Sequence, residues 1–184
     1  MRQRDFDLDT TTRDVLLTIK ARGRLLLVHP MVNRGTAFTF AGPHHGTILV
    51  QGCSVRSGFD PRISGFTRPG VPFGTSALVA YGTEAGTIGA LLLRDNDFEF
   101  APQAGDRALV TIGGVEQLRI AGTHRLFAGA NEVALRLEPA PGEDPLRGKR
   151  MHAGTRLRGR VEIGTRPATD AELQQLQADP DAGD

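Results

Sequence analysis

The sequence predicts an all-β fold, either a sandwich or a barrel, with about eleven short strands and one short C-terminal helix. The apolar stretches are short and end repeatedly at Gly, Pro, Asp or Asn, which is typical of strands joined by turns. Helix signals are confined to the last 20 residues or so. A framework of many short strands is therefore expected.

The strands are expected to follow one another as turn-connected neighbours, with the first four forming a meander. The sequence shows no internal repeat of the length found in solenoids. The predicted strands are residues 15–21, 24–29, 36–41, 47–51, 76–81, 88–94, 98–101, 108–112, 117–121, 133–138 and 156–163.

The chain of 184 residues is of a size typical of one domain with a core of its own. We expect residues 1–166 to form a single β-rich domain, interrupted by a long Gly/Pro-rich loop at residues 52–74. With 9 Phe, 1 Tyr and no Trp, the core must consist mainly of aliphatic side chains. A loop as long as residues 52–74 is often functional in a compact domain.

Residues 167–184 are expected to form a short helix followed by a flexible acidic tail. Thr169 precedes the segment Asp170–Gln177, and Glu172 lies three positions after Thr169. This spacing predicts a capping box, in which the two side chains satisfy backbone N–H groups at the helix start.

Charge and cysteine content limit the compartment and the partners. The net charge of +1 gives no global field to attract nucleic acid, which argues against a nucleic-acid partner. The single cysteine, Cys53, has no second cysteine in the chain to pair with, which fits a reducing compartment. The sequence has no signal-peptide pattern and no apolar run long enough to span a membrane. We therefore expect a cytoplasmic protein, or part of a particle assembled there.

Three histidines suggest a metal site in a small β-barrel enzyme or ligand-binding protein. His44 and His45 lie at a predicted turn between Pro43 and Gly46, and His124 follows a predicted strand. Imidazole is a common ligand of transition metals. Solvent-facing turn histidines are the alternative, and no other cofactor is indicated.

Positive charge concentrates near the end of the β-rich region. Arg156, Arg158 and Arg160 alternate with apolar residues, so on one strand they would share a face. Such a ridge suits phosphate or another anion. The alternative is an edge strand whose charges discourage aggregation.

These observations favour a non-catalytic binding or assembly module, such as a subunit of a viral, tail-like or secretion particle, with protein partners or copies of itself. No catalytic residue set is recognisable. The alternatives are the metal-dependent β-barrel with His44, His45 and His124, and phosphate or nucleic-acid binding through the ridge from Arg156 to Arg160.

Overall fold

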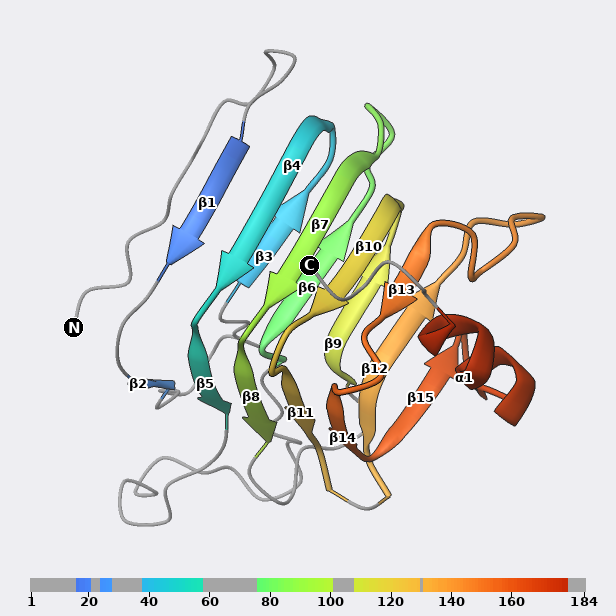
Figure 1. Cartoon of the computed structure of the whole chain (residues 1–184). Helices are drawn as coiled ribbons and strands as arrows, with labels where there is room; N and C mark the ends of the chain where they lie inside the picture. Colours follow the sequence, from blue (N-terminus) through green and yellow to red (C-terminus); the bar gives the residue numbers. More distant parts are fainter. Residues whose placement is uncertain are drawn as a thin grey trace, which may run out of the picture.

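The computed structural model describes residues 16–20, 24–27, 38–57, 76–100, 108–129 and 131–178. Their strands form three sheets, here named A, B and C, with five, five and six strands. Successive strands along the chain enter sheets A, B and C in turn (Figure 1). The chain therefore winds as a solenoid, in which each coil contributes one strand to each sheet.

Sheet A contains, in spatial order, β1 (Leu16–Lys20), β4 (His44–Gln51), β7 (Ile88–Arg94), β10 (Val115–Ala121) and β13 (Lys149–Met151). Sheet B contains β2 (Arg24–Leu27), β5 (Ser54–Ser57), β8 (Asp97–Phe100), β11 (Arg125–Phe127) and β14 (Arg156–Arg158). Sheet C contains β3 (Phe38–Ala41), β6 (Leu78–Tyr81), β9 (Ala108–Gly113), β12 (Val133–Glu138), β15 (Arg160–Ile163) and β16 (Arg166–Pro167).

The predicted sandwich or barrel is wrong, because the strands pair in parallel. Among the described strands only β16 pairs antiparallel, with β15. Parallel neighbours cannot be joined by a tight hairpin and need a crossover. Here strands of the other two sheets supply that crossover, so the first four strands form no meander. In its parallel pairing the chain is closer to α/β proteins than to a sandwich or barrel.

Unequal coil lengths explain why no repeat is visible in the sequence. Thr47 pairs with Ala90, 43 residues further on, whereas Ala90 pairs with Gln117, only 27 residues further on. Part of the longer coil is the segment 52–74, which was predicted to be a single loop. Its residues Ser54–Ser57 form β5, and residues 58–74 lie outside the described part of the chain.

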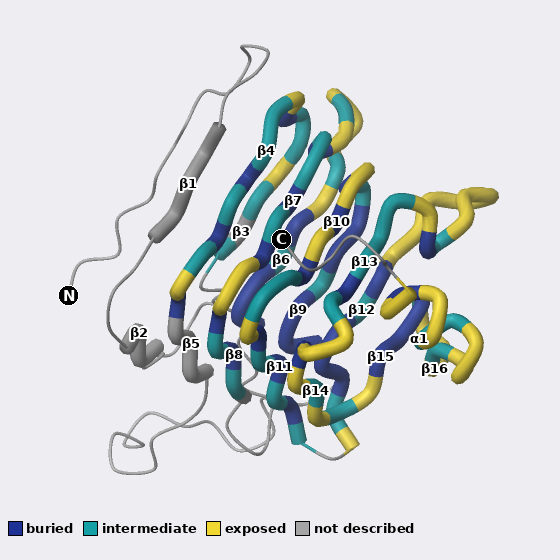
Figure 2. Tube along the Cα trace, viewed as in Figure 1, coloured by how far each residue is buried: buried dark blue, intermediate teal, exposed yellow. Residues whose placement is uncertain are grey.

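The core consists of rows of apolar side chains that run along the solenoid axis, one residue from each coil. Members of a row are register partners in one sheet. Buried and more exposed positions alternate along β6 and β11, whereas β9 and β12 are buried at most positions (Figure 2). Burying one such side chain stabilises the fold by roughly 1.5–3 kcal/mol. Two of these rows are Val50, Leu93, Ile120 and Met151 in sheet A, and Ala80, Ile112, Leu137 and Ile163 in sheet C.

Strand β16 and helix α1 (Asp170–Gln177) cover the C-terminal end of the solenoid. β16 pairs with β15, the last parallel strand of sheet C. The helix contacts β13, and its Leu176 is buried with the core. An unpaired sheet edge is a site of unwanted association, and these two elements cover part of that edge.

The predicted helix and its capping box are confirmed. The Thr169 side chain accepts a hydrogen bond from the Glu172 backbone N–H (3.3 Å), and the Glu172 carboxylate accepts one from the Thr169 N–H (2.8 Å). Arg166 of β16 donates to both carboxylate oxygens of Glu172, at 2.8 and 2.6 Å. These hydrogen bonds lower the pKa of Glu172 to about 2, and the bond from Arg166 has the largest effect.

Adjacent coils approach closely at the corner where sheet C leads into sheet A. Gly114 has a left-handed backbone (φ +59°), and a Cβ at this position would overlap the backbone nitrogen of Gly82. The Gly82 N–H donates to the Gly113 carbonyl (3.0 Å), which holds the two coils together. A glycine is therefore needed at position 114 for its conformation and for its lack of a side chain.

We expect Gly114→Ala to destabilise the fold more than Gly164→Ala. Gly164 is also left-handed (φ +61°), but nothing lies within 4 Å of its Cβ position. The left-handed backbone costs either alanine about 1–2 kcal/mol, and overpacking adds about 1–3 kcal/mol at position 114 only. Urea unfolding followed by circular dichroism measures both. Equal losses would show that the coils do not meet at Gly114.

Candidate functional site

The three histidines of the predicted metal site lie at separate places in the solenoid. The pair that was expected in a turn instead begins β4, where His44 is buried and His45 is exposed. His124 is fully buried, just before β11. The described residues contain no group of three or more His, Cys, Asp or Glu side chains that could hold a metal ion. The structure therefore does not bring His44, His45 and His124 together in one metal site.

His124 instead belongs to a buried row at the corner where sheet A leads into sheet B. We call this row the corner column: Cys53, Asn96, His124 and Thr155, each of which immediately precedes a strand of sheet B and is buried. The residues that follow them, Ser54, Asp97, Arg125 and Arg156, are register partners. The column is thus one position repeated in four coils.

Hydrogen bonds repeat between neighbouring members of the corner column. The Cys53 backbone N–H donates to the Asn96 side-chain oxygen (2.9 Å). One coil later, the Asn96 backbone N–H donates to His124 Nδ1 (3.1 Å). The Asn96 side-chain amide also donates to the Val50 carbonyl (2.8 Å). These side chains therefore satisfy buried backbone groups where the chain turns between sheets.

The surroundings of His124 keep its ring neutral. Because Nδ1 accepts a hydrogen bond, the proton of the neutral ring lies on Nε2, which is buried without a hydrogen-bond partner among the described residues. The ring meets Phe98 edge-on, with centroids 5.4 Å apart. Desolvation by burial lowers the pKa of His124 to about 4, against a smaller opposing effect of Asp95. A cation at this position is disfavoured.

The outer face of sheet B carries a cluster of arginines around an aromatic ring. The guanidinium carbons of Arg125 and Arg158 lie 4.3 and 4.9 Å from the centroid of the Phe127 ring. Phe127 and Arg158 are register partners, and Arg125 pairs in the same way with Arg156. We call Arg125, Phe127, Arg156 and Arg158 the Arg–Phe patch.

Two carboxylates at the edge of the Arg–Phe patch neutralise it only in part. Asp97 lies 3.3 Å from Arg125, and Glu99 lies 3.9 Å from Arg158. Arg156 is exposed, and its side chain makes no hydrogen bond or ion pair with a described residue. Three arginines against two carboxylates leave the face with a net positive charge. Ion pairs this exposed are weak and open to competition.

The predicted arginine ridge is divided between two sheets. Residues 156–163 do not form one strand, because Gly159 (φ +114°) turns the chain from β14 into β15. A Cβ at Gly159 would lie 2.8 Å from the Glu132 carbonyl oxygen. Arg156 and Arg158 therefore face outward from sheet B, whereas Arg160 belongs to sheet C. The prediction that all three share one strand face is wrong.

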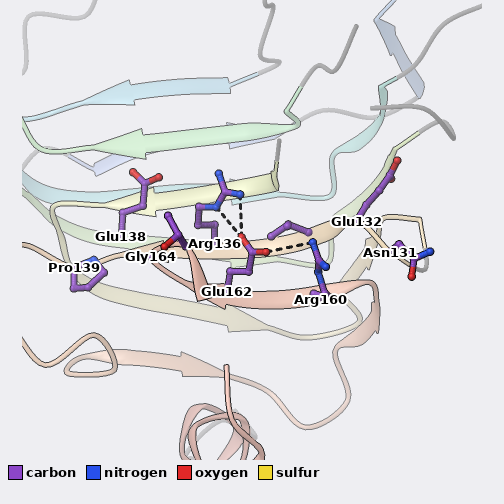
Figure 3. A pocket seen from close by; sticks show the side chains of 10 residues that line it. Asn131, Glu132, Arg136, Glu138, Pro139, Arg160, Glu162 and Gly164 are labelled. Atoms are coloured by element: carbon purple, nitrogen blue, oxygen red, sulfur yellow. Dashed lines mark hydrogen bonds and ion pairs between the residues drawn. The ribbon is translucent and has the colours of Figure 1, made fainter. Parts of the chain in front are cut away.

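Arg160 borders a hollow of about 610 Å³ on the outer face of sheet C, which we call the sheet C hollow (Figure 3). On its floor, Arg136 donates from Nε and Nη2 to one oxygen of Glu162, at 3.1 and 2.9 Å. Arg160 approaches the other oxygen at 3.4 Å. The hollow is lined by Asn131, Glu132, Val133, Arg136, Glu138, Pro139, Arg160, Glu162, Gly164 and Thr165.

Some residues of the Arg–Phe patch and of the sheet C hollow were not predicted from the sequence. Arg125 and Phe127 lie on β11, which has only three residues and is too short for an alternating pattern to be recognised. Arg136 and Glu162 are 26 positions apart and meet because β12 and β15 are neighbours in register. If the coils were aligned with one another, the sequence would show these residues at equivalent positions. The unequal coil lengths hide that alignment.

Comparison with protein-family models, with curated proteins and with solved structures gives no match for this chain. Within the described ranges, no helix is long and apolar enough to cross a membrane.

We expect acid to destabilise the fold through His124. In the unfolded chain, His124 binds a proton near pH 6.5, whereas in the folded chain it does so only near pH 4. Stability is therefore fully present above about pH 6.5 and declines as the pH falls toward 4, by about 3 kcal/mol in total. Urea unfolding at several pH values measures this decline.

His124→Asn should reduce the loss of stability at low pH and keep the hydrogen bonds of the corner column. By analogy with Asn96, the new side-chain oxygen can accept the Asn96 N–H, and the new amide can donate to the carbonyl of Leu93, the register partner of Val50. His45→Asn, at an exposed position, is the control and should leave the pH dependence unchanged. If His124→Asn has no effect on it, His124 is not the titrating group.

Proposed function

We propose that this chain is a non-catalytic binding module, and that its Arg–Phe patch binds an acidic segment of a protein partner. The observation that supports this most directly is the arrangement of the patch in register. The rows Asp97–Arg125–Arg156 and Glu99–Phe127–Arg158 each cross three neighbouring strands. Neighbouring strands are about 4.8 Å apart, so the patch presents its charges at a regular spacing on a sheet.

The contacts within the patch favour recognition of carboxylates. Stacking on Phe127 orders the guanidinium groups of Arg125 and Arg158 before a partner arrives, which reduces the entropy lost on binding. A planar guanidinium can hold a carboxylate through two parallel hydrogen bonds. A carboxylate of a partner can compete with the half-buried Asp97 and Glu99 for Arg125 and Arg158.

The same contacts argue against nucleic acid as the partner. Single-stranded nucleic acid binds through bases stacked on aromatic rings in addition to phosphate contacts. The Phe127 ring is half-buried and already in contact with two guanidinium groups. This arrangement supports an acidic protein segment, which needs the charges but not the ring.

A labelled ten-residue polyglutamate peptide tests this function. We expect binding that weakens steeply with salt, and a loss of affinity of about tenfold in Arg156→Gln/Arg158→Gln, corresponding to about 1.4 kcal/mol. Fluorescence anisotropy measures both.

The matched control is Arg119→Gln/Arg147→Gln, which removes the same charge from exposed positions outside sheet B. If both double variants lose the same affinity for the peptide, binding depends only on net charge, and a site on sheet B is contradicted. A single-stranded oligonucleotide that bound more tightly than the peptide at equal salt would reject the choice of partner.

The N-terminal end of the solenoid, formed by β1, β2 and β3, favours a second function: assembly with copies of the same chain into a larger particle. Among the described strands, β1, β2 and β3 each pair with one neighbour only. Such edges can be extended by strands of another chain. At the other end of the solenoid, Leu146 and Leu176 pack into the core of the same chain.

Light scattering with an edge variant tests assembly. The N–H groups of Phe38 and Gly42 point to β6, since they donate to Ala77 and Tyr81. By strand alternation, the N–H of Thr39 points away from β6, to the side of β3 where no described strand pairs with it. We expect a concentration-dependent oligomer that dissociates in Thr39→Pro, because proline removes that donor. A strict monomer at high concentration, or an oligomer that Thr39→Pro leaves intact, would contradict assembly through β3.

A further inference from the structure

Glu138 lies at one end of the sheet C hollow. Arg160 lies at the other end together with Glu132, whose carboxylate accepts a hydrogen bond from the Gly129 N–H (2.8 Å). Figure 3 shows Glu138 and Arg160 on opposite sides of the Arg136–Glu162 pair. Glu138 is exposed, and its carboxylate makes no hydrogen bond or ion pair with a described residue. The Arg160 side chain is 50% exposed, with one contact to Glu162 at 3.4 Å. Both ends can therefore accept a ligand group.

The centre of the hollow is held in place by strong pairing. The Glu162 side chain is only 8% exposed, and its two oxygens face Arg136 and Arg160. Two hydrogen bonds from the Arg136 guanidinium converge on one carboxylate oxygen of Glu162 and hold it in place. This floor lies between Glu138 and Arg160.

The strand register sets the distance between the two ends. Arg160 is the partner of Val133 at the start of β12, whereas Glu138 is the last residue of that strand. The hollow extends from Arg160, the first residue of β15, to Gly164, which directly follows the strand. At the rise of a parallel strand this corresponds to roughly 13 Å. An extended chain of about four residues spans this length.

We propose that the sheet C hollow binds a short peptide with free ends, in an extended conformation and three to four residues long. Its terminal ammonium group lies at Glu138, and its terminal carboxylate lies at Arg160. The volume of about 610 Å³ falls in the range of small-molecule sites. Asn131 and Thr165 on the lining supply side chains that can bond to peptide groups of the ligand.

The length preference is tested with glycine oligomers of two to six residues, titrated against the ¹⁵N-labelled full-length protein. We expect triglycine or tetraglycine to bind most tightly, with shifts in the amides of residues 160–165 and in Arg160 Nε. Blocking either end of the peptide, by N-acetylation or C-amidation, should weaken binding about tenfold, corresponding to about 1.4 kcal/mol.

Variants at the two ends assign each end of the peptide. Glu138→Gln should remove the effect of N-acetylation but not that of C-amidation, and Arg160→Gln should do the reverse. Arg160→Lys retains a positive charge beside Glu162 and should bind more tightly than Arg160→Gln. The controls, Glu143→Gln and Arg147→Gln, change exposed residues that do not line the hollow and should leave all affinities unchanged.

Three results would overturn the proposal: no saturable binding of any oligomer, shifts outside the sheet C hollow, or end-blocking effects that persist in both end variants. The hollow lies on sheet C and the Arg–Phe patch on sheet B, so the two proposals can fail separately. Arg156→Gln/Arg158→Gln should leave glycine-oligomer binding intact.

Discussion

Parallel pairing in register between successive coils is the constraint on which the rest of the structure depends. Each strand residue lies beside its equivalent in the next coil, so side chains form rows along the axis. Val50, Leu93 and Ile120 illustrate this inside sheet A. A row must therefore be chemically compatible along its whole length, because one unsuited residue would disturb the coils on both sides.

The same constraint governs the polar positions. In the corner column, Asn96 accepts the Cys53 N–H and His124 accepts the Asn96 N–H, so two different side chains bond to the equivalent backbone group of the preceding coil. On the surface, Arg136 meets Glu162 because they are register partners. Residues that are 26 or more positions apart in the chain thus lie on adjacent strands. Both candidate binding surfaces arise in this way, one on sheet B and one on sheet C.

Strong local patterns were readable from the sequence. Residues 88–94 and 133–138 were predicted strands and form β7 and β12, since each is long enough to show its apolar character. The helix at Asp170–Gln177 was predictable because its capping box is a local motif. Strands β5, β11 and β13 have only three or four residues. Their stability comes from neighbouring coils and not from their own sequence, so they left no local signal.

By itself, the sequence determined an aliphatic core, a largely β-stranded chain and a capped C-terminal helix, because composition and local hydrogen bonding suffice for these features. Only the tertiary structure decided that the strands pair in parallel across three sheets. It also placed His124 in a buried corner, and it separated Arg160 from Arg158 at Gly159. The physical reason is that parallel pairing is a contact between residues 25 to 44 positions apart, and its register depends on coil lengths that no local pattern records.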